Sequence, residues 1–189
     1  MVAGTLGLRR LFLALPLGDE ARAILSQVLP MLPGTIVPPE NWHLTTRFLG
    51  RVDLVTAERI VAEIDGAELG STFEVRLGEM GAFPRSNRAT VLWLGVAKGK
   101  SRLEELNAVC EEAAQGAGLP PEDRPFSAHL TLSRIRPHQD VRSVIDAYEP
   151  VPVSWKADRI VLYHSTMGRG GAIYTPFEEF LFKFRAGSG

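Results

Sequence analysis

Apolar residues follow two different spacings along the chain, and the spacing predicts which segments are strands and which are helices. Residues 9–15 are predicted to form a buried strand, because the two arginines at its start are followed by a continuous apolar run from Leu11. After Asp19, which we expect to cap a helix, apolar residues recur three and four positions apart. The chain is therefore predicted to open with a strand and then an amphipathic helix, whose apolar face is Ala21, Ile24, Leu25, Val28 and Leu32.

The middle of the chain has strand and helix patterns separated by turn residues. Pro38 and Pro39 predict a turn, and Gly50 ends the strand that follows it. A polar loop at residues 83–89 contains two arginines, Arg85 and Arg88. The predicted elements are a strand at 42–49, a helix at 56–64, and strands at 73–77 and 90–96.

A further helix pattern begins at Ser101, where Glu104 three residues later completes a capping box. Its apolar face consists of Leu103, Leu106, Val109, Cys110 and Ala113. The helix should end near Gly116 and Gly118, before a proline-rich loop at residues 119–125. The remaining predictions are a strand at 128–135, a helix from an Asp140 cap to Tyr148, and long strands at 153–165 and 173–184.

Composition and charge limit the classes of protein that fit this pattern. The chain has 189 residues, 45% of them hydrophobic, and no linker divides it, so we expect one domain of residues 1–189 with two tightly packed lobes. The net charge of -1 disfavours sequence-independent binding to long nucleic acid, so a nucleic-acid substrate would be held locally. Cys110 is the single cysteine, and no apolar stretch reaches the roughly 18 residues of a membrane span. We expect a cytoplasmic monomer.

The tripeptide His-Leu-Thr occurs twice, at residues 43–45 and 129–131, each time within a run of strand character. Residues two apart in a strand face the same way, so each histidine should project with its threonine while the leucine packs inward. The repeat indicates a duplicated chain. If the halves face each other, two pairs of imidazole and hydroxyl groups meet across one cleft.

Two facing imidazoles suit phosphodiester chemistry. One group must take a proton from the nucleophile and the other must give a proton to the leaving oxygen, and an unperturbed histidine pKa of about 6.5 suits both roles. The hydroxyls of Thr45 and Thr131 would stabilise the charge that develops on the phosphorus oxygens. We expect no metal and no cofactor. The H-E-x-x-H, G-x-S-x-G and P-loop motifs of other enzyme classes are absent from the sequence.

A third His-x-Thr, at residues 164–166, shows that the tripeptide alone is weak evidence. It lacks the central leucine and runs into Gly168, Gly170 and Gly171, so we expect His164 on the surface or at the rim of the cleft. The tripeptides by themselves are equally consistent with ordinary strand histidines that make local hydrogen bonds.

The flanking sequence separates these two interpretations. Segments 38–50 (PPENWHLTTRFLG) and 124–134 (RPFSAHLTLSR) resemble the two signatures of the 2H phosphoesterase superfamily. Segments 81–84 and 91–95 resemble its RNA 2',3'-cyclic phosphodiesterase branch, the 2'-5' RNA ligase-like proteins, and the similarity extends over residues 10–184. The motif positions are His43, Leu44, Thr45, Thr46, His129, Leu130, Thr131 and Leu132.

The resemblance implies both a fold and a reaction. The fold is α+β, bilobal and duplicated, with two mainly antiparallel sheets facing a central cleft and helices on the outside. His43 would donate a proton to the departing 3' oxygen and His129 would activate water, so that a 2',3'-cyclic phosphate on RNA or a nucleotide opens to a 2'-phosphate. Two alternatives remain: a nucleotide-binding module without turnover, and 2'-5' RNA ligation, which runs the same site in reverse.

Two arginines near the motifs are candidates for binding the substrate. Strand alternation places Arg47 on the same face as His43, where it would neutralise phosphate. The same alternation turns Arg134 away from His129. Arg134 would need a bulge to reach the cleft, so its assignment rests on the resemblance.

Three aromatic residues have weaker assignments. Phe126 either stacks a nucleobase or packs in the core. Phe48 shares the parity of Leu44 and is expected in the core, and Tyr163 is kept as a candidate residue of the cleft.

Overall fold

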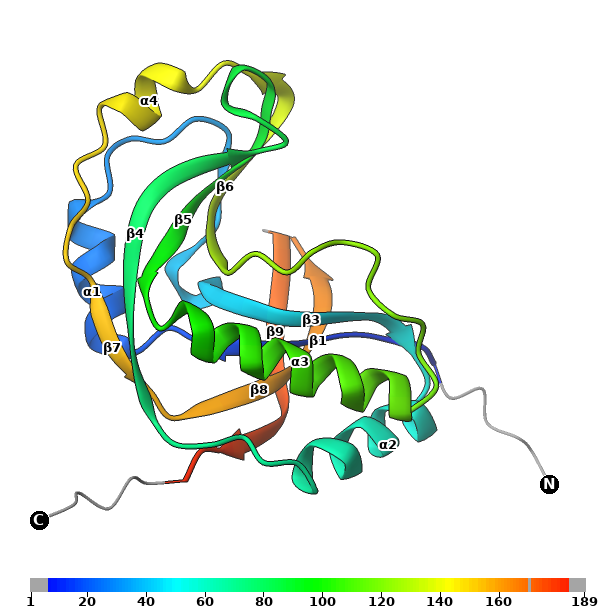
Figure 1. The fold of residues 1–189 in the computed structure, drawn as a ribbon. Coiled ribbons are helices and arrows are strands. Elements are labelled where there is room, and N and C mark those ends of the chain that lie inside the picture. The colour runs from blue at the N-terminus through cyan, green and yellow to red at the C-terminus, as the bar shows by residue number, and fades with distance from the viewer. Residues whose placement is uncertain (1–6, 170, 184–189) are drawn as a thin grey trace, which may run out of the picture.

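The strands form one strongly curved sheet, and the longer helices pack against it (Figure 1). A computed structural model describes residues 7–169 and 171–183. The strands are β1 (Arg9–Pro16), β2 (Thr35–Ile36), β3 (His43–Val52), β4 (Phe73–Phe83), β5 (Ala89–Lys98), β6 (His129–Gln139), β7 (Ser154–Ala157), β8 (Arg159–Gly168) and β9 (Gly171–Leu181).

The order of the strands is β7-β4-β5-β6-β3-β1-β8-β9, with the short β2 beside β6. The named strands pair antiparallel. The two His-Leu-Thr strands meet at the centre, where Leu44 of β3 lies opposite Leu130 of β6. The sequence led us to expect two separate sheets, which is wrong because this central pair joins all the strands into one.

The helices are α1 (Asp19–Val28), α2 (Leu54–Asp65), α3 (Lys100–Gly116) and α4 (Arg142–Asp146), with single 3-10 turns η1 (Pro39–Asn41) and η2 (Ser86–Arg88). Figure 1 shows α2 and α3 side by side, with α3 crossing β3. Two hydrogen bonds attach α3 to β3, because Asn107 Nδ2 donates to Thr46 O (2.8 Å) and Cys110 Sγ donates to Thr46 Oγ1 (3.3 Å). The first half of β3 is thereby attached to α3 at Thr46.

The predicted helices exist, but their predicted caps are wrong in two cases. Gly18 is the N-cap of α1, and Asp19 lies in its first turn, where its carboxylate pairs with Arg22 at 2.6 Å. α3 begins at Lys100, so Ser101 lies inside the helix and forms no capping box. Its N-cap is Gly99, whose φ of 94° favours glycine and where a Cβ would lie 2.7 Å from Glu74 O.

Two strand predictions also differ from the structure. The long strand predicted at 153–165 is two strands, β7 and β8, which are separated at Asp158 and belong to opposite ends of the sheet. The helix expected from Asp140 to Tyr148 is shorter, although Asp140 Oδ1 does accept a hydrogen bond from Arg142 N at 3.1 Å. The predicted end of the last strand, residue 184, lies outside the described residues.

The core lies beneath the central strands. Leu44 and Leu130 are 1% and 0% exposed, and the largest buried side chains around them are leucines and isoleucines of β1, β5, α2 and α3. Burial of these side chains fixes which face of β3 and β6 points inward, because a slip by one residue would expose both leucines. In the described part of the chain, no helix is long and apolar enough to cross a membrane.

Candidate active site at the centre of the sheet

The first residues of β3 and β6 present the same side chains in the same way. Both strands begin at the motif histidine, and the first seven residues of both have the same order of half-buried, buried and exposed positions. His43 and Thr45 are half-buried on one face, as are His129 and Thr131, whereas Leu44 and Leu130 point into the core. The alternation predicted for both tripeptides is confirmed.

Each histidine is oriented by a backbone carbonyl two residues earlier. His43 Nδ1 lies 2.7 Å from Asn41 O, and His129 Nδ1 lies 2.7 Å from Ser127 O. A carbonyl oxygen only accepts hydrogen bonds, so Nδ1 must be the protonated nitrogen in both rings. This leaves each Nε2 available for proton transfer, and Nε2 of His43 lies 3.1 Å from Thr45 Oγ1.

The pKa values of both histidines lie below the ordinary value, which favours the neutral imidazole. Burial lowers the pKa of His43 from 6.5 to about 4, because desolvation outweighs the opposing hydrogen bond to Asn41. The charges of His129 and Arg134 lower the pKa of His43 further. Burial likewise lowers the pKa of His129, and the charge of Arg134 adds to this effect. Leu44 and Leu130, the residues that follow the two histidines, lie opposite each other, so His43 and His129 lie close together on adjacent strands.

Aromatic rings from neighbouring strands surround each imidazole. The ring centroids of Phe12 and Tyr174 lie 4.9 Å and 5.3 Å from that of His43. On the other side, Phe83 lies 4.9 Å and Trp93 lies 6.1 Å from His129. Phe83 and Trp93 lie in segments that carry the resemblance, but no sequence pattern indicates the contacts of Phe12 and Tyr174 with His43. Phe12 belongs to a continuous apolar run in which both faces of the strand are buried, so alternation cannot identify it.

A β-bulge follows each motif threonine at the same position. Against β1, Thr45 and Arg47 are opposite consecutive residues, so Thr46 is the extra residue. Against β5, Thr131 and Ser133 are opposite consecutive residues, so Leu132 is the extra residue. A bulge reverses the alternation of the residues beyond it. The side chains after each motif therefore face the opposite way from the sequence prediction.

The bulge in β3 moves Arg47 away from the site, which contradicts its predicted role in binding phosphate. Arg47 is 7% exposed and its guanidinium forms ion pairs with Glu111 and with Glu122, the latter at 3.3 Å. It also donates to Pro120 O at 2.6 Å. Arg47 thus connects β3 to α3 and to the loop that leads into His129.

The same reversal places Phe48 and Arg134 on the face of the histidines. Phe48 is 55% exposed, so the expectation that it is a core residue is wrong, and its ring lies 6.0 Å from Phe12. Arg134 is exposed on the equivalent position of β6. Both residues lie five positions after their motif histidine, one in each half of the chain.

The other candidates lie in three different surroundings. Phe126 is partly buried and packs against the hydrophobic core. Tyr163 does lie near the site, with its ring 6.3 Å from that of His43. His164 follows Tyr163 in β8 and lies opposite Leu11, whereas Tyr163 lies opposite Phe12. His164 therefore faces away from the histidine pair.

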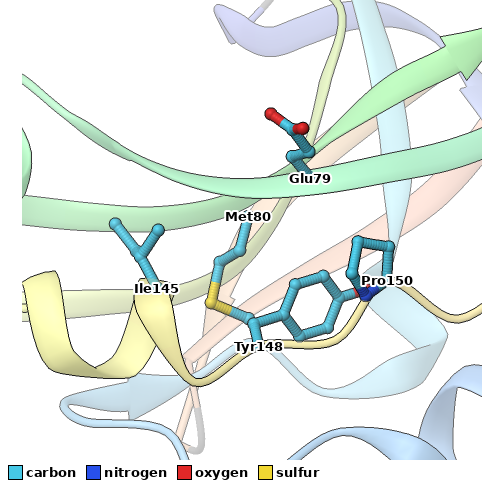
Figure 2. A pocket seen from close by; sticks show the side chains of 5 residues that line it. All are labelled: Glu79, Met80, Ile145, Tyr148 and Pro150. Atoms are coloured by element: carbon cyan, nitrogen blue, oxygen red, sulfur yellow. The ribbon is translucent and has the colours of Figure 1, made fainter.

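A separate hollow of 230 Å³ lies beside α4 (Figure 2). Met80, Ile145 and Tyr148 contribute its side chains together with Pro150, while the Glu79 carboxylate points to the other side of β4. It contains no histidine, so it offers none of the acid-base chemistry of the central site. Within residues 7–169 and 171–183, no three His, Cys, Asp or Glu side chains are grouped so that they could hold a metal ion.

The chain belongs to the 2'-5' RNA ligase superfamily, whose family model matches residues 37–169. The resemblance inferred from the two motifs is thus confirmed. The chain is 33% identical over 156 residues to a protein of Aeropyrum pernix named RNA 2',3'-cyclic phosphodiesterase, covering 78% of this chain and 86% of the relative. A Thermus thermophilus protein of the same name is 32% identical, with 90% of this chain and 89% of the relative covered.

A solved structure has the same fold. The crystal structure of Escherichia coli LigT complexed with 3'-AMP superposes with a TM-score of 0.75 at 27% identity, covering 93% of this chain and 98% of LigT.

Proposed function

We propose that the protein opens 2',3'-cyclic phosphates at the ends of RNA or on nucleotides, without a metal ion, to give 2'-phosphates. The observation that carries this proposal is the pair of imidazoles, each with Nδ1 hydrogen-bonded to a carbonyl and Nε2 available in the same site. The names of the relatives and the nucleotide bound by LigT agree with this reaction.

The reaction needs one histidine as base and the other as acid. In our assignment, His129 Nε2 takes a proton from water as the water oxygen attacks phosphorus, and the bond from phosphorus to O3' breaks. His43 Nε2 gives its proton to O3', which leaves a 2'-phosphate and a free 3' hydroxyl. Thr45 and Thr131 would donate hydrogen bonds to the non-bridging oxygens, where negative charge accumulates.

Arg134 and Phe48 are suited to bind different parts of the substrate. Arg134 is close enough to both histidines to lower their pKa values, so its guanidinium would pair with the reacting phosphate. Phe48 exposes an aromatic ring beside Phe12 on the side of His43, and such a ring stacks a nucleobase without sequence preference. The leaving 3' oxygen and its nucleoside would then lie beside His43.

We also infer that the two halves of the chain are duplicated lobes of one domain. Four strands lie on each side of the junction between the two motif strands, β3, β1, β8 and β9 on one side and β6, β5, β4 and β7 on the other. The matching bulges and matching histidine contacts support the same inference.

The direct test is to incubate the protein and excess EDTA with a short RNA that ends in a 2',3'-cyclic phosphate. We expect a 2'-phosphate, and we expect His43→Ala and His129→Ala each to abolish most of the turnover. His164→Ala is the matched control, because it removes the third His-x-Thr histidine from the opposite face and should leave the rate near normal.

Other outcomes would change the assignment. A 3'-phosphate product would mean that the wrong bond has been assigned to the acid. Binding of the RNA without any product would favour a nucleotide-binding module. Because the family model is named for RNA ligation, RNA with a free 5' hydroxyl should be included, and a 2'-5' linked product would show that the same site also runs in reverse.

A further inference from the structure

Exposed arginines continue from the central site along β6. Beyond the bulge, Ser133 and Ile135 are fully buried, whereas Arg134 and Arg136 between and after them are exposed. Because side chains alternate along a strand, both arginines lie on the face that carries His129. At about 3.3 Å per residue, Arg136 is roughly 20 Å from His129 along β6. That distance is longer than a single nucleotide.

Two more arginines lie beside the far end of β6. They belong to the turn between β4 and β5, where η2 is attached to the end of β6 by a hydrogen bond from Val141 N to Ser86 O at 2.8 Å. The residue after η2, Ala89, lies opposite Gln139 of β6. Arg85 and Arg88 are both exposed at this tip. We call Arg85, Arg88, Arg134 and Arg136 the arginine track.

The arginine track is a concentration of unneutralised positive charge in a protein whose net charge is -1. In the described ranges, none of its four guanidinium groups forms an ion pair with a carboxylate. The nearby Asp140 is already paired with Arg142 at 2.6 Å. An extended polyanion would supply the missing negative charge.

The opposite side of the site has a different character. Three aromatic rings, those of Phe48, Tyr163 and Tyr174, lie on the His43 side of the site, and the exposed Arg10 lies on the same face of β1 as Phe12. Rings suit a nucleobase and arginines suit phosphates. The phosphates of a longer RNA, which continue from O5' of the terminal nucleoside, are therefore favoured along the arginines of β6.

We propose that the arginine track binds the phosphates of the RNA strand that precedes the cyclic end, so that the preferred substrate is an oligonucleotide and not a mononucleotide. This inference rests on the proposed function, with Arg134 reserved for the reacting phosphate. Arg85, Arg88 and Arg136 then contact the body of the RNA. Because the net charge of the protein is -1, RNA would have to be bound by a local group of positive charges, and the arginine track is such a group.

The test compares two substrates on the same enzyme: a 2',3'-cyclic mononucleotide and a short oligoribonucleotide that ends in a 2',3'-cyclic phosphate. We expect the wild-type kcat/KM to be higher on the oligonucleotide. The triple variant Arg85→Ser, Arg88→Ser, Arg136→Ser should lower the ratio of the two kcat/KM values by about 10-fold or more. The salt dependence of log kcat/KM on the oligonucleotide should weaken by roughly 0.7 per lost phosphate contact. Arg59→Ser, an exposed arginine on α2, is the matched control and should leave the ratio unchanged.

Two results would overturn the arginine track. The first is an unchanged ratio in the triple variant, and the second is an equal fall in the ratio with Arg59→Ser. If the wild-type protein turns over neither substrate, the proposed function fails instead. The track is then judged by the fluorescence anisotropy of a labelled oligonucleotide, and an affinity that is equal in wild type and triple variant would reject it.

Discussion

At the scale of single residues, the free site is prepared for an anion. Burial and the positive charge of Arg134 lower the pKa of both histidines, which favours the neutral imidazoles over the imidazolium ions before substrate binds. The proposed acid, His43, must nevertheless be protonated when O3' departs. A bound phosphate supplies the negative charge that raises the pKa of a neighbouring imidazole. Protonation of His43 and binding of phosphate are therefore coupled in the proposed mechanism.

This coupling predicts proton uptake when inorganic phosphate or a 2'-nucleotide binds between pH 6 and 7. Titration calorimetry in two buffers that differ in ionisation enthalpy would measure it, and we expect a net uptake that falls in His43→Ala. His164→Ala serves as the control, since it faces away from the site. Binding without any change in protonation in the wild-type protein would contradict the role of His43 as acid.

The motif threonines give a second prediction at this scale. Thr45→Ala and Thr131→Ala should each lower kcat about ten- to a thousand-fold, because each removes a hydrogen-bond donor to the developing charge. Threonine transfers no proton in the proposed mechanism, so the bell shape of the pH profile should persist. Thr45→Ser and Thr131→Ser keep the hydroxyl and should retain most of the rate. Loss of one limb of the profile in an alanine variant would contradict this role.

At the scale of elements, the sequence predicted each motif correctly up to its threonine and incorrectly beyond it. Strict alternation assigns Arg47 to the site and Phe48 to the core, and the structure has them the other way round. The cause is a bulge whose existence depends on the register with β1, a partner that alternation within β3 does not contain. The predicted cap of α3 was wrong for a related reason. The N-cap is Gly99, because the backbone there passes so close to Glu74 that a Cβ would clash, and this contact cannot be inferred from the helix sequence.

Arg47 is predicted to stabilise the fold and not to bind substrate. Arg47→Met should lower the free energy of unfolding by roughly 3 kcal/mol, because it removes a buried guanidinium and leaves the half-buried carboxylate of Glu111 without its ion-pair partner. Chemical denaturation at pH 7 measures the change. Lys98→Met removes an exposed ion pair with Glu74 and should cost less than about 1 kcal/mol. An Arg47→Met protein of normal stability whose KM alone rises would restore the phosphate-binding role.

At the scale of the whole molecule, the repeated tripeptide predicted that two halves meet at the histidines. It did not predict that they share one sheet. Leu44 and Leu130 would be buried leucines whether their strands pair in one sheet or belong to two sheets packed face to face, and the structure shows that they pair. The sequence pattern also could not predict that residues 153–165 are divided between opposite ends of the sheet. Both β7 and β8 have strand composition, and their separate partners lie far away in the chain.

Stability should fall as the pH is lowered from 7 to 5. The folded pKa of His43 is about 4, below its unfolded value of 6.5, so the unfolded chain binds more protons throughout this window and gains relative stability. We expect a loss of about 2 kcal/mol at pH 5 from His43, with a smaller loss in the same direction from His129. Denaturation curves at both pH values measure it. His43→Gln should lose most of the dependence, and an unchanged dependence in that variant would contradict the neutral state of His43.

The equivalent positions of Phe48 and Arg134 make the two sides of the site different. Two identical halves would accept a cyclic phosphate in either of two orientations and would cut either phosphorus-oxygen bond. Because Phe48 would stack the base and Arg134 would bind the phosphate, the substrate would bind productively in only one orientation. In the proposed function, the difference between these two equivalent positions therefore favours one regiochemistry of the product, a 2'-phosphate instead of a 3'-phosphate.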